Sequence, residues 1–236
     1  MRRLWPDPVA ELTCDELLEA YPRSSQPLVR VNMIASLDGA ATLAGRSGPL
    51  GNAADQDLMV RLRSLADVVL VGAGTVRVEG YRGPLIDETA RGARLAAGLT
   101  EHPRIAIISG SLDLDPAFFD DAPVRPLLIT HAGAADRFGD RAEVLVCGES
   151  AVDVGVMLTE LAARGLTQVL CEGGPHVTGA LTAADAIDEL CLSLSPLLVG
   201  PGAMRITDGP ASVPRRMRLG HVLTDDELLF LRHIRP

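Results

Sequence analysis

Short hydrophobic segments alternate with longer amphipathic segments along most of this chain. Six of the hydrophobic segments are rich in β-branched residues, which is typical of strands. They cover residues 28–34, 67–71, 104–109, 125–130, 143–147 and 168–171. Continuous apolar runs of this length indicate parallel strands that are buried on both faces. We therefore expect a mainly parallel α/β sheet.

The segments between these strands predict helices, because their apolar residues recur every three to four positions. The clearest helix begins after Asn52, a good N-cap, and continues to about Ala66. The other helices are expected at residues 10–20, 87–99 and 151–164, and after Glu172-Gly-Gly-Pro.

The C-terminal part has a different pattern. Residues 187–199 alternate and then become continuously apolar, and residues 217–223 and 227–234 predict two strands joined by a short polar turn. Two strands so close in sequence indicate an antiparallel edge of the sheet. At the other end, the polar stretch 23–27 separates an N-terminal extension (1–27) from a single domain (28–236).

Charge limits the partners that this chain can have. The net charge is −9, and an acidic surface repels nucleic acid and anionic membranes, so neither is expected as a partner. All 22 basic residues are arginines, because the sequence contains no lysine. This excludes a Schiff-base lysine and a Walker-type phosphate lysine. A side-chain cation that binds an anionic ligand must therefore be an arginine or a histidine.

The cysteines and the N-terminus predict neither a metal site nor a membrane anchor. Cys14, Cys147, Cys171 and Cys191 form no Cys-x-x-Cys pair and have no histidine at zinc spacing, so no metal is expected. Cys171 and Cys191 lie in apolar runs and are expected to be buried free thiols. No segment resembles a signal peptide or approaches the ~20 residues of a membrane span. These features predict a cytoplasmic protein.

Two glycine-rich turns follow buried strands. The first, Gly72-Ala-Gly74-Thr75, lets a ligand approach the backbone, but Arg77 stands where a dinucleotide fingerprint has its third glycine. The second, Glu172-Gly-Gly-Pro175, opens a helix whose free N–H groups and dipole suit a pyrophosphate. Either turn alone is compatible with a purely structural role. Two such turns at the carboxyl ends of strands in one domain favour a nucleotide site.

An acidic residue follows the first strand. Asp38, in Ser36-Leu-Asp-Gly39, lies where the ligand crevices of open α/β sheets form. It is either a carboxylate that faces the substrate or a turn residue bonded to nearby backbone N–H groups. The sequence leaves both interpretations open.

Taken in order and spacing, several motifs together resemble one known family. They are Asn32-x-x-x-Ser36-Leu-Asp38-Gly, Gly45-x-Ser47, Arg63, Gly72-x-Gly-Thr75-Val-x-x-Glu79 and Glu172-Gly-Gly. This set is similar to the reductase domain of the bifunctional deaminase–reductase of riboflavin biosynthesis, over about residues 28–234. The resemblance implies a dihydrofolate-reductase-like α/β fold, NADPH as cofactor and a homodimer. The implied reaction reduces 5-amino-6-(5-phosphoribosylamino)uracil to its ribitylamino form.

The resemblance also implies roles for individual residues. Those implied to bind the cofactor are Ala35, Gly72, Gly74, Thr75, Glu79, Gly173, Gly174, Pro175, His176, Val177, Thr178, Gly179 and Ala180. Ser109 begins a loop, Ser109–Ser111, that is expected to hold the adenosine 2′-phosphate. Those implied to bind the substrate are Asn32, Ser47, Arg63 and Glu172. Arg63 suits a phosphate ester, and Asp38 and Glu172 are the candidate proton donors.

The chain departs from the family pattern mainly on the substrate side. Ala40 replaces a basic residue, Pro49 replaces a tryptophan, and Glu79-Gly-Tyr81 replaces the usual Asp-Asp-Pro. The sequence lacks the zinc-deaminase motifs, so deaminase activity is not expected. Two other functions stay open. One is reduction of dihydrofolate, with Asp38 as the pterin-binding acid, and the other is NADPH binding without turnover.

Overall fold

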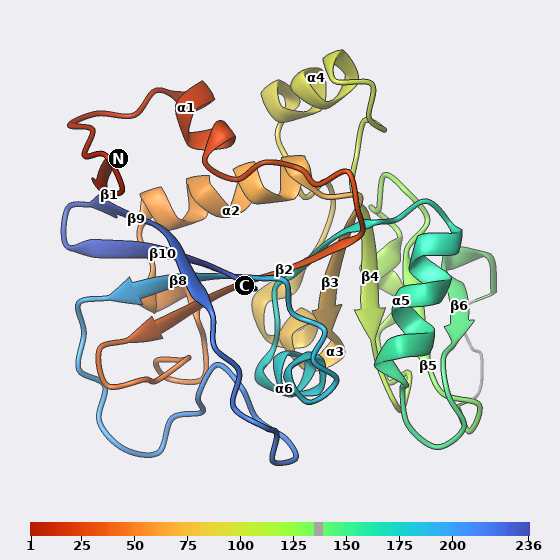
Figure 1. The fold of residues 1–236 in the computed structure, drawn as a ribbon. Coiled ribbons are helices and arrows are strands. Elements are labelled where there is room, and N and C mark those ends of the chain that lie inside the picture. Colours follow the sequence, from red (N-terminus) through yellow and green to blue (C-terminus); the bar gives the residue numbers. More distant parts are fainter. Residues whose placement is uncertain (135–138) are drawn as a thin grey trace.

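A computed structural model describes residues 1–134 and 139–236 (Figure 1). These residues form a ten-stranded sheet with the strand order β1-β9-β10-β8-β2-β7-β3-β4-β5-β6. The strands are β1 (Arg2–Trp5), β2 (Leu28–Ser36), β3 (Val68–Gly72), β4 (Arg104–Ile108), β5 (Leu127–Thr130), β6 (Glu143–Val146), β7 (Gln168–Cys171), β8 (Glu189–Ser195), β9 (Arg218–Asp225) and β10 (Leu228–Ile234). The helices are α1 (Cys14–Glu19), α2 (Ala53–Leu65), α3 (Ala73–Thr75), α4 (Glu88–Ala96), α5 (Val154–Ala163) and α6 (Pro175–Ala183). Short helical turns are η1 (Gly48–Leu50), η2 (Val76–Gly80), η3 (Pro116–Phe119) and η4 (Gly139–Arg141).

The parallel part of the sheet confirms the expectation from the hydrophobic runs. The seven strands from β8 to β6 run parallel to one another, in the order β8-β2-β7-β3-β4-β5-β6. Every residue of β3, β5 and β7 is buried. Helices cover both faces in Figure 1, which explains why these strands are continuously apolar rather than alternating.

Successive residues of β3 show how the two faces are filled. Val68 and Leu70 belong to the core cluster that packs under α5 and α6, together with Met157 and Leu181. Val69 points to the opposite face and joins the cluster under α1 and α2. This alternation follows from the two-residue period of a strand and gives the molecule a helix–sheet–helix layering.

The antiparallel edge is also confirmed, and it contains one strand that the sequence did not predict. β10 pairs antiparallel with β8 and with β9, as expected for the C-terminal hairpin. β1 then pairs antiparallel with β9 inside the segment that we expected to be an extension. β1 has only four residues, three of them exposed, so it lacks the hydrophobic run that marks the central strands. The N-terminal segment is therefore part of the sheet, and the domain boundary at residue 27 stays a prediction.

The cysteines agree with the sequence analysis. All four are free; Cys147, Cys171 and Cys191 are buried and Cys14 is exposed. Burial raises the pKa of the Cys171 thiol to about 12, as it does for Cys191, so both behave as inert core residues. Within the described ranges, no helix has both the length and the apolar character that crossing a membrane requires.

Candidate functional site

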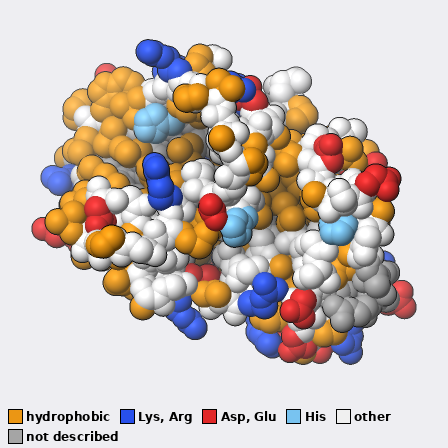
Figure 2. Space-filling view, turned by 90° about the horizontal axis from the view of Figure 1, so that it is seen from below, with side chains coloured by type: hydrophobic (Ala, Val, Ile, Leu, Met, Phe, Trp, Pro, Cys, Tyr) orange, Lys and Arg blue, Asp and Glu red, His pale blue; other side chains and the backbone are white. Residues whose placement is uncertain are grey.

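A large cavity opens at the carboxyl ends of the parallel strands. Its volume is about 880 Å³, within the usual range for ligand sites. Its walls come from β2, α2, the turns after β3, β4 and β7, and the start of α6. Figure 2 looks onto this end of the sheet and shows it hollowed, with hydrophobic side chains visible in the hollow. The position agrees with the crevice that open α/β sheets offer to ligands.

The two glycine-rich turns meet at the floor of this cavity. The Gly72 N–H donates to the Gly173 carbonyl oxygen at 2.8 Å, which joins the turn after β3 to the turn after β7. A Cβ on Gly174 would lie 2.6 Å from Thr75 Oγ1, and a Cβ on Gly72 would lie 3.0 Å from Val177 Cγ2. A side chain at position 174 would thus collide with Thr75, and one at position 72 would press against Val177, so glycine at both positions leaves bare backbone at the cavity.

Helix α6 begins at this junction. Pro175 is its first residue, and its N-cap residue Gly174 makes no side-chain capping bond. The N-terminal backbone N–H groups of such a helix, with the positive end of its dipole, form a ready site for an anion. His176 lies beside this end, 77% exposed, with Nδ1 3.2 Å from Asp208 Oδ2. This arrangement fits the pyrophosphate of a dinucleotide.

A buried ion pair forms the wall between α2 and β7. Arg63 donates through Nε and Nη2 to the two carboxylate oxygens of Glu172, both at 2.7 Å. The Tyr81 hydroxyl donates to Glu172 Oε2, also at 2.7 Å, and the Arg63 guanidinium lies 5.3 Å from the centre of the Tyr81 ring. Burial is the largest single influence on Arg63 and would lower its pKa, but the charge and hydrogen bonds of Glu172, helped by Tyr81, together raise the pKa. Burial, together with Glu172, raises the pKa of Tyr81, so its hydroxyl stays protonated.

This pairing changes what Arg63 offers to a ligand. A third donor, Nη1, is directed to the Leu85 carbonyl oxygen at 3.2 Å. The guanidinium charge is thus matched by Glu172, and most of its donors are used inside the protein. Binding of a substrate phosphate by Arg63 stays a prediction, and it would require the phosphate to share Arg63 with Glu172.

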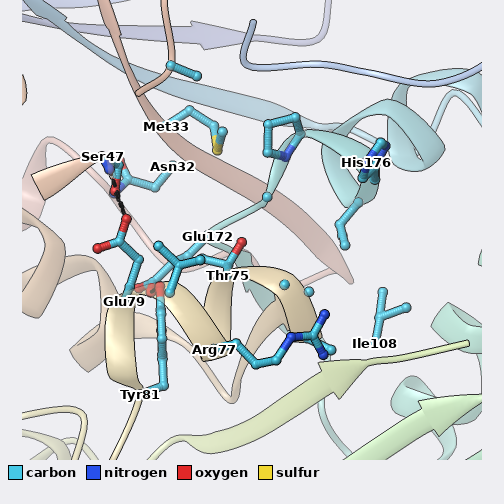
Figure 3. Close-up of a pocket in the computed structure, with 18 of the residues that line it drawn as sticks. Asn32, Met33, Ser47, Thr75, Arg77, Glu79, Tyr81, Ile108, Glu172 and His176 are labelled. Atoms are coloured by element: carbon cyan, nitrogen blue, oxygen red, sulfur yellow. Dashed lines mark hydrogen bonds between the residues drawn. The ribbon is translucent and has the colours of Figure 1, made fainter. Parts of the chain in front are cut away.

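A second polar wall lies near β2, as Figure 3 shows. The Ser47 N–H and hydroxyl both donate to Glu79 Oε1, at 2.8 and 2.9 Å. The structure therefore joins a residue expected to bind the substrate to one expected to bind the cofactor. Asn32 lines the same cavity, and its buried Oδ1 has no hydrogen-bond partner in the described structure. An unpaired buried acceptor at a cavity wall is a place where a ligand donor is needed.

Most residues expected at the site line this one cavity. They are Asn32, Ser47, Arg63, Gly72, Gly74, Thr75, Glu79, Ser109, Glu172, Gly174, Pro175, His176, Val177 and Ala180. Five others lie outside its lining: Ala35, Asp38, Gly173, Thr178 and Gly179. Of these, Gly179 has a packing reason to be glycine, because a Cβ there would lie 2.1 Å from the Asp208 carbonyl oxygen.

Asp38 takes the position of a turn residue. Its carboxylate accepts from the Ser36 hydroxyl at 2.5 Å, from the Val199 N–H and from the Gly200 N–H at 2.7 Å. The Ser36 hydroxyl, followed by the two backbone N–H groups, lowers the pKa of Asp38 to about 2. An acid that is ionised at neutral pH and lies outside the cavity is poorly placed to deliver a proton there. The geometry thus favours the second of the two interpretations of Asp38.

Several cavity residues were missed by the sequence analysis, among them Arg77, Tyr81 and Asp55. Arg77 is exposed, and its Nη1 donates to the Asp113 carbonyl oxygen at 2.8 Å, so it lies next to the loop that follows β4. Tyr81 completes the Arg63–Glu172 cluster, and Asp55 adds a carboxyl from the first turn of α2. The substitution of Asp-Asp-Pro by Glu79-Gly-Tyr81 was a visible signal for Tyr81. From the sequence, Arg77 was noted only as the residue at the place of a third fingerprint glycine, and no motif marked Asp55.

The mainly parallel sheet with an antiparallel edge, together with the likeness to solved deaminase–reductase structures (TM-scores of 0.69 and 0.70), gives the chain the dihydrofolate-reductase-like α/β fold. The model of the RibD C-terminal domain family matches residues 27–231, and the chain belongs to this family. The resemblance found in the sequence motifs is therefore confirmed.

Similar proteins agree with this assignment. A 2,5-diamino-6-ribosylamino-4(3H)-pyrimidinone 5′-phosphate reductase of Archaeoglobus fulgidus is 26% identical over 182 residues, which cover 74% of this chain and 83% of that protein. The riboflavin biosynthesis protein RibD of Mycobacterium tuberculosis is 28% identical over 201 residues, covering 83% of this chain and 50% of RibD. The crystal structure of a pyrimidine reductase-like protein from Corynebacterium diphtheriae superimposes with a TM-score of 0.78 at 28% identity, covering 88% of this chain and 91% of that one. The named reductases among these relatives place the chain in a family of oxidoreductases.

Proposed function

We propose that this chain is an NADPH-dependent reductase of riboflavin biosynthesis that reduces a phosphoribosylaminopyrimidine to its ribitylamino form. The substrate is the uracil expected from the motifs, or the 2,5-diaminopyrimidinone named for the Archaeoglobus fulgidus relative. The observation that carries this proposal is the shared cavity. It combines two touching glycine turns for a dinucleotide with the Arg63–Glu172–Tyr81 cluster, in a chain whose relatives are reductases.

The residues present fit the cofactor. The bare backbone at Gly72 and Gly174 and the start of α6 suit the pyrophosphate. Arg77 suits the additional 2′-phosphate of NADPH, because it lies beside the Ser109–Ser111 loop and forms no ion pair in the described part of the chain. An acid in this place, as in NAD-binding sites, would instead repel that phosphate.

Bound NADPH would supply the hydride, so the chain's own residues must orient the ribosyl group and provide a proton. In the net reaction C1′ gains the hydride, the C1′–O4′ bond breaks and O4′ takes up a proton to become a hydroxyl. Of the two proton donors expected from the sequence, only Glu172 lines the cavity. Because Glu172 is ion-paired with Arg63, we propose that the proton comes from water bound to the Glu172 carboxylate, which Arg63 and Tyr81 hold in place.

The direct test is the consumption of NADPH with the uracil, with the diaminopyrimidinone and with dihydrofolate in separate assays. We expect turnover with at least one of the two ribosylaminopyrimidines and little with dihydrofolate. Turnover of dihydrofolate alone would establish the other reductase function. NADPH binding with no turnover of any of the three would make the protein a nucleotide-binding member of the family.

We also propose that the enzyme is a homodimer, as the family resemblance implies. Leu37, Leu197 and Leu198 are exposed, and the Leu37 N–H donates to the Leu197 carbonyl oxygen at 2.9 Å, so they form one apolar surface. A second copy would remove this surface from water. Light scattering on the purified protein should give twice the mass of the chain, and the mass of a single chain would contradict the dimer.

A further inference from the structure

Asp55 is a carboxyl that lines the cavity and has no role in the chemistry described above. It lies in the first turn of α2, and its Oδ1 accepts from the Ser193 hydroxyl at 2.5 Å. Glu172, by contrast, has both oxygens occupied by Arg63 and Tyr81, and Glu79 receives two donors from Ser47. Among the described residues Asp55 forms no ion pair, and Oδ2 accepts no hydrogen bond from the protein. Of these three cavity carboxyls, Asp55 therefore receives the fewest hydrogen bonds and can accept more from a ligand.

Within the described structure, Asp55 and Asn32 both leave acceptor oxygens unpaired on one wall of the cavity. Burial raises its pKa, which the Ser193 hydrogen bond offsets only in part, and no arginine compensates the carboxyl. Ser193 pairs with Ile34 in the β2–β8 register, and Asn32 lies two residues before Ile34 on the same face of β2. The unpaired Asn32 Oδ1 thus belongs to the same wall. A ligand that presents N–H groups to this wall would pair with both side chains.

We propose that Asp55 binds the 2-amino-4-oxopyrimidine edge of the substrate, and that the enzyme therefore reduces the 2,5-diaminopyrimidinone in preference to the uracil. This inference rests on the proposed function and selects one of its two substrates. In the diaminopyrimidinone, N3–H and the C2 amino group are adjacent donors that match the two oxygens of a carboxylate. In the uracil, the C2 substituent is a carbonyl oxygen, which a carboxylate repels. Sites built to bind a donor discriminate strongly against an analogue that lacks it.

A dihydropterin such as dihydrofolate has the same 2-amino-4-oxopyrimidine edge as the diaminopyrimidinone. The test must therefore distinguish these two ligands. We would measure kcat/KM for the diaminopyrimidinone, the uracil and dihydrofolate with the wild type, Asp55→Asn and Asp57→Asn. Asp57 is the matched control, because it lies on the same helix, is 56% exposed and pairs on the exposed side of the helix with Arg61, at 2.9 Å. Asparagine at position 55 keeps the size but offers one acceptor and one donor, the pattern that suits a uracil edge.

The wild type should prefer the diaminopyrimidinone by at least about tenfold. Asp55→Asn should lose about tenfold or more with that substrate and little with the uracil, so that the preference falls or inverts, whereas Asp57→Asn should keep it. Equal losses with both substrates would overturn the proposal, because Asp55 would then only hold β8 through Ser193. Equal use of both substrates by the wild type would overturn it as well.

Binding of the bare rings separates this proposal from the proposed function. Calorimetry with 2,6-diamino-4(3H)-pyrimidinone and with 6-aminouracil needs no turnover. Tighter binding of the diamino ring by the wild type, lost in Asp55→Asn, supports the role of Asp55 even if neither ribosyl substrate is reduced. Equal binding of the two rings would overturn it. If dihydrofolate is the substrate that shows the Asp55 dependence, the edge recognition holds and the riboflavin function fails.

Discussion

At the scale of single residues, the charged groups of the cavity are of two kinds. Some are already paired with an opposite charge of the protein, and the others are available to bind a ligand. Arg63 and Glu172 neutralise each other, and the pair is nearly enclosed, with exposed side-chain fractions of 12% and 3%. Breaking such a pair leaves a buried charge and is costly, so its main effect is to fix the shape of the substrate wall. In the part of the chain that the structure describes, Arg77 and Asp55 are bonded to neutral groups alone, and they are the residues from which we expect selectivity.

Arg77 gives the first prediction. Arg77→Ala should weaken NADPH binding by about tenfold or more, roughly 1.4 kcal/mol or above, because a charge-assisted contact to the 2′-phosphate is lost. NADH binding should change little. Arg82→Ala is the comparison, since Arg82 also lines the cavity but stacks 4.6 Å above the Phe118 ring. Dissociation constants measured at one salt concentration would decide, and an equal loss for NADPH and NADH would refute the role of Arg77.

The second prediction concerns Asp38, for which we expect a substitution to leave the activity nearly unchanged. Asp38→Asn should leave kcat within about twofold of the wild type, far from the ~100-fold loss that removing a general acid causes. Its melting temperature should fall, because asparagine has a single acceptor oxygen for the Ser36, Val199 and Gly200 donors. A loss of kcat by two orders of magnitude at an unchanged melting temperature would contradict this prediction and show that Asp38 takes part in catalysis.

At the scale of elements, α2 carries both Arg63 and Asp55 into the cavity, and its C-terminus is held by a buried arginine of α4. Arg94 is 2% exposed. Its Nη1 donates to the Ser64 and Ala66 carbonyl oxygens at 2.9 and 2.6 Å, and its Nε donates to the Thr100 carbonyl oxygen at 2.7 Å. A cation at this end of a helix satisfies carbonyl groups that have no partner in the helix and opposes the helix dipole.

We predict that Arg94→Met lowers the free energy of unfolding by about 3 kcal/mol, because several buried carbonyl groups lose a charged donor. Arg91→Met is the control on the same helix. Its ion pair with Glu101, at 3.0 Å, is half exposed and should contribute less than about 1 kcal/mol. Urea denaturation of the two variants and the wild type measures both values. Equal losses would show that Arg94 does not hold α2.

The elements also show what a sequence can predict. Asn52 caps α2 as expected, with its Oδ1 accepting from the Asp55 N–H at 3.0 Å, because the capping signal is local. The central strands were found because burial on both faces requires continuous apolar residues. The sequence did not predict strand β1, the contacts of Arg94 or the Tyr81–Glu172 hydrogen bond. Each of these depends on a partner that is far away in the sequence. The glycine turns were found from local spacing, whereas the roles of Arg77 and Asp55 depend on which strands end beside them.

At the scale of the whole molecule, the antiparallel end is held by a buried polar cluster. Glu189 accepts from Arg30 Nε at 2.7 Å and from Arg232 Nε at 3.1 Å, and both guanidinium groups lie about 6 Å from the Tyr21 ring, at 5.9 and 6.0 Å. His221 packs edge-on against the same ring at 4.7 Å and is 4% exposed. Burial, with the nearby Arg232, lowers the pKa of His221 to about 4.

This histidine predicts how stability depends on pH. Above pH 6.5 His221 is neutral in both the folded and the unfolded states. Between pH 6.5 and about 4 only the unfolded state takes up the proton, so the free energy of unfolding should fall as the pH falls, by up to on the order of 3 kcal/mol. Below about pH 4 both states are protonated and this loss ends. His221→Phe should reduce the fall measured by urea denaturation across this window, and an unchanged slope would contradict the assignment.

Hydride transfer to the ribosyl carbon is the step on which the proposed function depends. It is tested most directly with NADPH that carries deuterium at both C4 positions of the nicotinamide, each ribosylaminopyrimidine in turn, and mass spectrometry of the product. We expect the diaminopyrimidinone to give a ribitylamino product with one deuterium at C1′, in an amount equal to the NADPH consumed. A protein that binds NADPH but yields no labelled product from either ribosylaminopyrimidine would contradict the function proposed for this cavity.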